Sequence, residues 1–268
     1  MLNIYLIFVS ILIFFFIIIF IQNNYKYENY NDNNYNNYND NNNENDNDII
    51  YLTKEETIKF IINDNDNYIK SLSRYDLIAR KVNSHDEYIS KIINNTLSFN
   101  DTQIEKLNKC CFIANKFYFN KYKWKFALID NQYEEGYPHT REDIIFLSPK
   151  IINNQEDFLI EILIHESIHI YQRYNKHDID DYLISNGYTI SRKRITEPLI
   201  RANPDLDEYI YKDKNNVEMI YKYSSNNPIN INDLIKSSNN NEHPFEVMAY
   251  EIAGKYNSLL ISKYKHLI

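Results

Sequence analysis

The chain divides into three stretches by its pattern of hydrophobic and polar positions. Residues 4–21 form an almost unbroken apolar run, and residues 22–49 are rich in Asn, Asp and Tyr with few aliphatic side chains. From Ile50 onward, apolar positions recur with the periods of helices and strands. About 20 apolar residues can cross a bilayer as a helix, whereas the polar stretch cannot offset the entropy of its own ordering. We therefore predict a transmembrane anchor over 1–21, a disordered tether over 22–49 and a folded domain over 50–268.

The apolar run favours an uncleaved anchor over a cleaved signal peptide. A signal peptide has a basic start, a shorter apolar region and small residues at its cleavage site. This run has no basic side chain before it, and it continues into the polar residues 22–25. Only the α-amine and Lys26 flank the span, so the positive-inside rule does not fix its orientation. We expect residues 4–21 to hold the protein in a membrane.

The spacing of apolar positions after residue 50 predicts both helices and strands. Thr53 and Glu56 have the spacing of a capping box, so a helix is expected to start near Thr53. A helical period recurs over 75–82, 87–97, 100–118, 157–174 and 244–264. Strands are predicted over 123–129, 142–147, 209–211 and 217–223, with the last two forming a hairpin. This mixture predicts an α+β domain.

Charge and cysteine content exclude two kinds of protein. The formal net charge is −8, which is the wrong sign for binding the phosphate backbone of a nucleic acid. The only cysteines, Cys110 and Cys111, are adjacent, and adjacent side chains point apart on a helix or a strand. They therefore form neither a disulfide scaffold nor a CxxC metal motif. We expect no nucleic-acid partner, and we expect both thiols to lie in or beside the core.

The helix predicted over 157–174 carries a His-Glu-x-x-His motif at 165–169. Residues four apart share one helix face, so both imidazoles can bind a single metal ion. Zn²⁺ with three protein ligands keeps a position open for water. Glu166 lies about 100° further round the helix, which puts its carboxylate beside that water and off the metal. The pattern predicts His165 and His169 as zinc ligands and Glu166 as the general base that activates a zinc-bound water.

A third ligand must come from further along the chain, and the last predicted helix offers the best candidate. Glu246 shares a stripe with Ala249 and Ala253, whose small side chains let this helix approach the motif helix closely. Glu251 points about 140° away from Glu246 on the same helix. His243, just before the helix, is the closest rival. Other downstream carboxylates also stay open as ligands: Glu197, Asp205, Asp207 and Glu251. We predict Glu246.

Together these residues resemble a known family. The HExxH motif followed far downstream by Glu-x-x-Ala-x-x-x-Ala resembles the gluzincin type of zincin metallopeptidases, in which a glutamate is the third zinc ligand. Six segments also look similar to uncharacterised zincin-like proteins of large DNA viruses: 124–129, 138–141, 144–148, 165–173, 201–205 and 242–253. The resemblance covers about residues 50–268. It implies a zincin-like fold of N-terminal helices, a small sheet, the HExxH helix and a C-terminal glutamate helix, with His165, His169 and Glu246 binding zinc and Glu166 as base.

The sequence thus predicts a membrane-anchored zinc metallopeptidase that hydrolyses peptide or protein substrates, at a host or virion membrane if the chain is viral. Two alternatives stay open. One is a non-catalytic binding module that zinc stabilises but that is closed to substrate. The other is a structural protein of a membrane or virion. Glu166 argues against both, because retaining zinc does not by itself require this residue.

Weaker candidates surround the predicted site. His139 and Arg141 precede the strand over 142–147, where zincins offer a sheet edge to an extended substrate, and either side chain could stabilise an oxyanion. Tyr250, one turn beyond Glu246, could do the same. Each also has an ordinary structural interpretation as part of a polar loop or as a packed aromatic ring. The Asn-Pro-Asp sequence at 203–205 is typical of a turn.

Overall fold

The computed structural model describes residues 49–117 and 122–264. The predicted anchor and all of the predicted tether except Ile49 lie outside these ranges. Within them, none of the helices combines the length and the hydropathy needed to cross a bilayer. The described helices are α2 (Lys54–Asn63), α3 (Arg74–Ala79), α4 (His85–Asn94), α5 (Asp101–Phe117), α6 (Pro149–Ile152), α7 (Glu156–Tyr174), α8 (Lys176–Ser185) and α9 (Pro244–Tyr264). The described strands are β1 (Ile50–Tyr51), β2 (Thr96–Leu97), β3 (Lys125–Ile129), β4 (His139–Arg141), β5 (Ile144–Leu147), β6 (Thr189–Lys193), β7 (Tyr209–Lys212), β8 (Glu218–Met219), β9 (Tyr221–Tyr223) and β10 (Leu234–Lys236).

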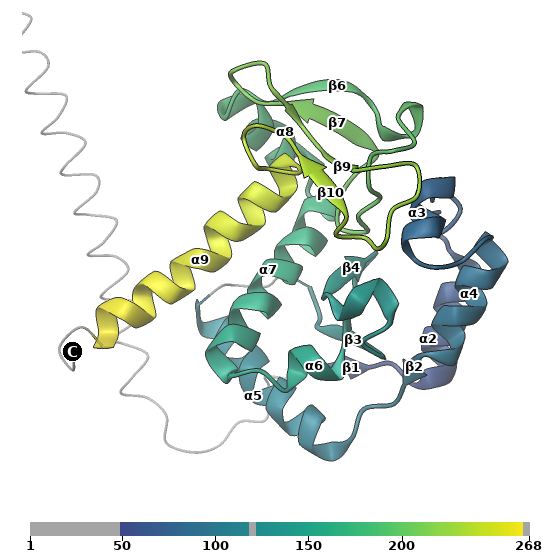
Figure 1. Cartoon of the computed structure of the whole chain (residues 1–268). Coiled ribbons are helices and arrows are strands. Elements are labelled where there is room, and N and C mark those ends of the chain that lie inside the picture. Colours follow the sequence, from purple (N-terminus) through teal and green to yellow (C-terminus); the bar gives the residue numbers. More distant parts are fainter. Residues whose placement is uncertain (1–48, 118–121, 265–268) are drawn as a thin grey trace, which may run out of the picture. The chain divides into compact units, whose positions relative to one another are not determined.

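A five-stranded mixed sheet lies at the centre of the described domain (Figure 1). Its order is β1-β3-β5-β4, with β2 also pairing with β3. β1, β3 and β5 are parallel, whereas β2 and β4 run antiparallel to their neighbours. β3 and β5 are almost wholly apolar because both faces of the sheet are covered. The predicted α+β class is confirmed.

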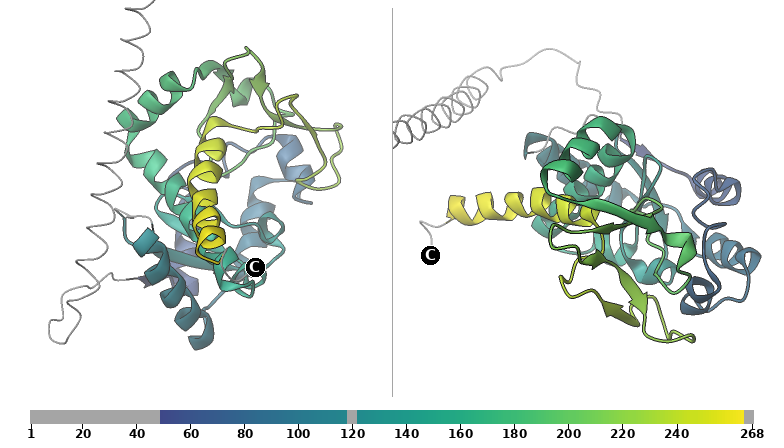
Figure 2. Two further views of the ribbon diagram at one scale, coloured as in Figure 1. Left: turned by 90° about the vertical axis from the view of Figure 1, so that its left-hand side faces the viewer. Right: turned by 90° about the horizontal axis from the view of Figure 1, so that it is seen from above.

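Two hydrophobic cores cover the two faces of this sheet. Alternate side chains of a strand point to opposite faces, so Phe126 and Leu128 join the core made with α5, α7 and α9, whereas Ala127 and Ile129 join the core made with α2, α3 and α4. The same alternation divides β5 between the two cores. Figure 2 shows α2 to α4 and α5 to α7 on opposite sides of the central strands. Packing on one face of the sheet thereby fixes the position of α7.

The helices predicted from apolar periodicity are largely confirmed. The capping box at Thr53 and Glu56 is present, with each partner bonding the backbone of the other. The helices predicted over 157–174 and 244–264 appear as α7 and α9, and α9 packs against α7 (Figure 1). The helix predicted over 87–97 ends earlier, at Asn94, because the chain turns into β2 to pair with β3.

Two strand predictions need correction. The strand predicted over 142–147 begins only at Ile144, because Glu142 has a positive φ of 51° in the turn that joins β4 to β5. The hairpin predicted from 209–211 and 217–223 is only partly right. β7 pairs with β8 as expected, but β9 leaves that sheet and pairs with β10. β6 and β10 were not predicted, because their side chains are mostly exposed and show little apolar alternation.

Candidate metal centre

Helix α7 presents the two motif histidines to one point. Its packed sides carry buried aliphatic residues, which hold the helix between α5, α9 and the sheet. His165 and His169 lie one turn apart, and their Nε2 atoms are 3.0 Å from each other. His169 is fully buried, whereas His165 is partly open to the cavity described below. The motif therefore faces inward on a rigid helix.

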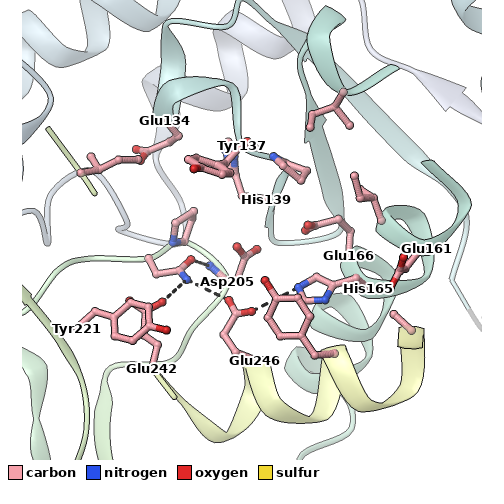
Figure 3. A pocket seen from close by; sticks show the side chains of 18 of the residues that line it. Glu134, Tyr137, His139, Glu161, His165, Glu166, Asp205, Tyr221, Glu242 and Glu246 are labelled. Atoms are coloured by element: carbon pink, nitrogen blue, oxygen red, sulfur yellow. Dashed lines mark hydrogen bonds and ion pairs between the residues drawn. The ribbon is translucent and has the colours of Figure 1, made fainter. Parts of the chain in front are cut away.

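Helix α9 brings Glu246 to the same point. Ala249 and Ala253 are at most 1% exposed and pack in the core that contains α7, as the small-residue stripe predicts. The Glu246 carboxylate lies 3.4 Å from His165 Nε2 and 3.9 Å from His169 Nε2. Figure 3 shows Glu246 rising from α9 toward His165. In the described part of the chain, His165, His169 and Glu246 are the group of side chains that can together hold a metal ion, with ligand atoms all within 4.8 Å of one another.

The spacing and chemistry of these donors fit Zn²⁺. Ligand atoms at about 2.0–2.1 Å from a tetrahedral zinc are about 3.3 Å apart, and the separations of 3.0, 3.4 and 3.9 Å bracket this value. His169 Nδ1 lies 2.8 Å from the Gln172 side-chain oxygen, which accepts its proton, so Nε2 carries the lone pair. Gln172 in turn donates to the Phe245 carbonyl at the start of α9. A second hydrogen bond of this kind orients a ligating imidazole.

The charges of the trio also suit a cation. Burial would raise the pKa of Glu246, but the neighbouring imidazoles and Asn203 lower it to about 2. Burial lowers the pKa of His169 to about 3. Burial also lowers the pKa of His165, but Glu246 and Glu166 outweigh this effect and raise it above the ordinary value. At neutral pH the trio thus offers a carboxylate and a neutral His169, the deprotonated forms that bind metal ions.

Glu166 lies beside the trio but does not join it. Its side chain is 2% exposed, and burial raises its pKa to about 7. One carboxylate oxygen, Oε2, accepts a hydrogen bond of 2.8 Å from the Thr140 hydroxyl on β4. Among the described residues nothing donates to Oε1. The carboxyl is thus held on one side and open toward the cavity on the other, as a general base requires.

The segment 201–205, which includes the turn expected at 203–205, forms another wall of the site. Asn203 donates to Glu246 Oε1 over 3.1 Å. Arg201 binds Glu242 through both Nε and Nη2. Asp205 accepts from the backbone N–H of Thr140 over 2.6 Å. Burial, with the charges of Glu166 and Glu246, raises the pKa of Asp205 well above its ordinary value.

Among the described residues, the rival ligands do not join the trio. His243 Nε2 donates to Asp207, and its Nδ1 accepts from the Phe245 backbone, so His243 caps α9. Glu251 is exposed and takes no part in the trio. Asp205 contacts β4, and Glu197 forms an ion pair with Arg192. The geometry favours Glu246, which the stripe of alanines indicated.

The three weaker candidates, Arg141, His139 and Tyr250, differ in whether they reach the cavity. Arg141 is fully buried, is held by Asp64 and Asp66 and does not line the cavity, so the prediction that it reaches an oxyanion is not supported. His139 does line the cavity, but its ring stacks on Phe146 in the core. Tyr250 lies at the cavity, with its ring 4.5 Å from that of His165.

The strand over 142–147, now β5, was expected to form the edge of the sheet, but β4 forms it. β5 lies between β3 and β4. At the middle of β4, the Thr140 N–H is bound by Asp205 and its carbonyl by Arg173. Because β4 has only three residues, these two side chains occupy the outward groups that an extended peptide would need at Thr140.

A cavity of about 810 Å³ opens in front of the trio. Its lining includes His165, Glu166, Asp205 and Glu246, which Figure 3 shows around a common space. Exposed aromatic side chains stand at its sides: Tyr137, Phe158 and Tyr250. This volume is in the range of pockets that hold small molecules or a short stretch of peptide.

Comparisons of the chain with protein-family models, with curated proteins and with solved structures find no match. The interpretation of this site therefore depends on its residues and their geometry.

Proposed function

We propose that this chain is a zinc-dependent peptidase of the zincin type, with Glu246 as the third ligand. The observation that carries this proposal is the convergence of His165, His169 and Glu246 on one point, with the Glu166 carboxyl held beside it and open to a cavity. When bound there, Zn²⁺ supplies Lewis acidity, which polarises a carbonyl group and makes water a stronger acid.

The chain's own residues supply the proton transfers. Glu166 takes a proton from the attacking water at Oε1, the oxygen that accepts no hydrogen bond from the described residues. The same carboxyl then returns that proton to the departing amine. In the metal-free protein, burial raises the pKa of Glu166 above its ordinary value, which favours a carboxyl that can hold the proton between these two steps. Asn203 and Gln172 keep Glu246 and His169 in place meanwhile.

A non-catalytic zinc module is the alternative, and the open side of Glu166 disfavours it. A site that only stabilises a fold is closed by four protein ligands, whereas three converge here and a cavity of about 810 Å³ faces them.

The test uses the full chain in detergent, loaded with one equivalent of zinc and offered a peptide library. We expect cleavage by the wild-type protein. Glu166→Gln should keep its zinc but lose about 10²- to 10⁴-fold in kcat, because it removes the proton acceptor and leaves the ligands intact. A Glu166→Gln protein that cleaves like the wild type would refute the mechanism. Stoichiometric zinc without any cleavage would favour the non-catalytic module.

We further propose, from the sequence alone, that residues 4–21 anchor this peptidase in a membrane. The full chain should remain in the membrane fraction after carbonate extraction. Recovery of the intact chain, starting at residue 1, in the soluble fraction would contradict the anchor. A mature chain starting near residue 22 would instead indicate a cleaved signal.

A further inference from the structure

Thr140 is the middle residue of β4, the edge strand that runs beside α7, and its side chain is fully buried. All three of its polar groups are bonded, each to a different side chain. The backbone N–H donates to Asp205 Oδ1 over 2.6 Å, and the carbonyl accepts from Arg173 Nη2 over 2.7 Å. The hydroxyl lies 2.8 Å from Glu166 Oε2.

The two backbone contacts fix where the hydroxyl points. Thr140 stands opposite Ile145 in the β4–β5 ladder, and its N–H and carbonyl both turn away from β5. Asp205 and Arg173 hold them over 2.6 and 2.7 Å, which are distances of short hydrogen bonds. A β-branched side chain on a fixed backbone has few accessible rotamers. The direction of the Thr140 hydroxyl is therefore set before any ligand arrives.

The hydroxyl in turn selects one orientation of Glu166. It also lies 3.2 Å from the Glu166 carbonyl, but it has a single proton, which goes to the nearer carboxylate oxygen. Because Oε2 accepts this hydrogen bond, Oε1 is the carboxylate oxygen that can bond to a molecule in the cavity. Arg173 lies two turns after Glu166 on α7 and also binds the Pro204 carbonyl, so one side chain ties α7, β4 and the 201–205 segment together.

We propose that Thr140 is a positioning residue for Glu166: its hydroxyl, fixed by Asp205 and Arg173, holds the carboxyl so that Oε1 faces the substrate. This inference rests on the proposed peptidase function. It assigns no contact between Thr140 and the metal or the substrate.

Thr140→Val tests the inference, because valine keeps the shape and removes only the hydroxyl. We expect kcat to fall about 10- to 100-fold, the loss typical of a residue that orients a functional group, with KM within about twofold. Zinc content should not change. Thr140→Ser should restore most of kcat, because it returns the hydroxyl to the same backbone. If Thr140→Val does not fold, Thr140→Ala replaces it in the same comparison.

Thr96→Val is the matched control. Thr96 is also a fully buried strand residue whose hydroxyl donates one hydrogen bond, to the Ile92 carbonyl, but it does not line the cavity. Thr96→Val should lower the free energy of unfolding about as much as Thr140→Val does, but its kcat should stay at the wild-type value. Equal kcat for Thr140→Val and the wild type would overturn the inference, as would a kcat loss that Thr140→Ser fails to restore.

A second readout does not depend on activity. In crystal structures of the metal-free proteins, the Glu166 carboxyl should have one conformation in the wild type and in Thr140→Ser. In Thr140→Val it should rotate to another conformation or occupy two alternate conformations. An unmoved carboxyl in Thr140→Val would refute the positioning role. If the wild type cleaves no peptide, the proposed function fails, while this structural comparison still decides the role of Thr140.

Discussion

Two clusters of buried charge lie on either side of the 201–205 segment, and they are built in opposite ways. In the Arg80 cluster, formed by Arg80, Asp76 and Glu134 with surrounding tyrosines, donors meet acceptors. Arg80 binds both oxygens of Glu134 at 2.8 Å, and Tyr68 and Tyr88 donate to the same carboxylate. In the metal cluster, formed by His165, His169 and Glu246, two imidazoles and one carboxylate converge on one point beside a cavity, with no Arg or Lys among them.

From this difference we infer that the Arg80 cluster supports the fold and that the metal cluster is suited to bind a cation. A buried charge is costly unless it is paired, and the Arg80 cluster meets this condition within the protein. In the metal cluster, Glu246 has Asn203 and the two imidazoles as its neighbours, and a bound cation would draw on all three candidate ligands at once. The two clusters are also connected, because Asp76 binds the Ala202 N–H and Arg80 binds the Ala202 carbonyl. The paired cluster thus holds the segment that carries Asn203 and Asp205 into the metal cluster.

The largest expected effect is on metal binding. Glu246→Ala should lower bound zinc from about one per chain to nearly none, because only two ligands remain. Metal analysis after dialysis against a weak chelator measures it. Glu251→Ala, on the same helix but outside the trio, is the matched control and should keep its zinc. If Glu246→Ala keeps zinc and His243→Ala loses it, the ligand assignment is wrong.

Breaking the Arg80 cluster should affect stability and leave the ligands unchanged. Glu134→Gln removes the nearer of the two carboxylates that pair with Arg80 and leaves Asp76 3.6 Å away. This loss should cost up to about 3–5 kcal/mol in the free energy of unfolding. Denaturant titration of the metal-free protein measures this cost. The double variant Arg80→Met/Glu134→Leu, which replaces both partners by apolar side chains, should be clearly less destabilised. A Glu134→Gln protein as stable as the wild type would show that the pair is not a structural element.

His139 lies beside Glu134 of the Arg80 cluster and lines the cavity, and it should give the fold a pH dependence. Burial lowers its pKa to about 4, so between pH 4 and its ordinary value near 6.5 the unfolded chain binds a proton that the folded chain does not. Acidification through this window should therefore destabilise the metal-free protein, by at most about 3 kcal/mol. His139→Phe should reduce the slope of that part of the stability profile and leave the share that comes from His169, whose pKa is also lowered. If the variant has the same slope of unfolding free energy against pH as the wild type, the pH dependence comes from other groups.

The smallest of these effects concerns the residue that orients His169. Gln172→Ala removes the acceptor for the Nδ1 proton, and zinc affinity should fall about 10- to 100-fold. Competition with a chromophoric chelator measures it. Gln132→Ala, an exposed glutamine on a turn, should leave the affinity unchanged. Equal affinities for both variants would mean that Gln172 does not orient the imidazole.

Much of the helical frame could be predicted because its determinants are local. The capping box at Thr53 and the apolar periods of α7 and α9 each lie within one element. The i, i+4 spacing placed His165 and His169 on one face, and the alanine stripe indicated how α9 would approach. Gln172, three residues after His169, also lies on that face and could have been found by the same spacing argument.

Thr140, Asn203 and Asp205 could not be found in this way. Thr140 precedes Glu166 by 26 residues, and Asn203 precedes Glu246 by 43. Nothing in the local pattern of either segment indicates such a partner, and the Asn-Pro-Asp sequence is fully explained as a turn. The edge position of β4 was missed for a related reason, since strand order depends on pairing between distant segments.

The sequence by itself determined the mixed α+β class, the two long helices and the face on which each candidate ligand lies, because a helix fixes the directions of its own side chains. Only the tertiary structure decided which carboxylate meets the histidines, which strand forms the sheet edge and which side chain holds Glu166. Those outcomes depend on how α7, α9, β4 and the 201–205 segment pack together. Packing is a property of distant residues in contact, so no single stretch of the chain encodes it.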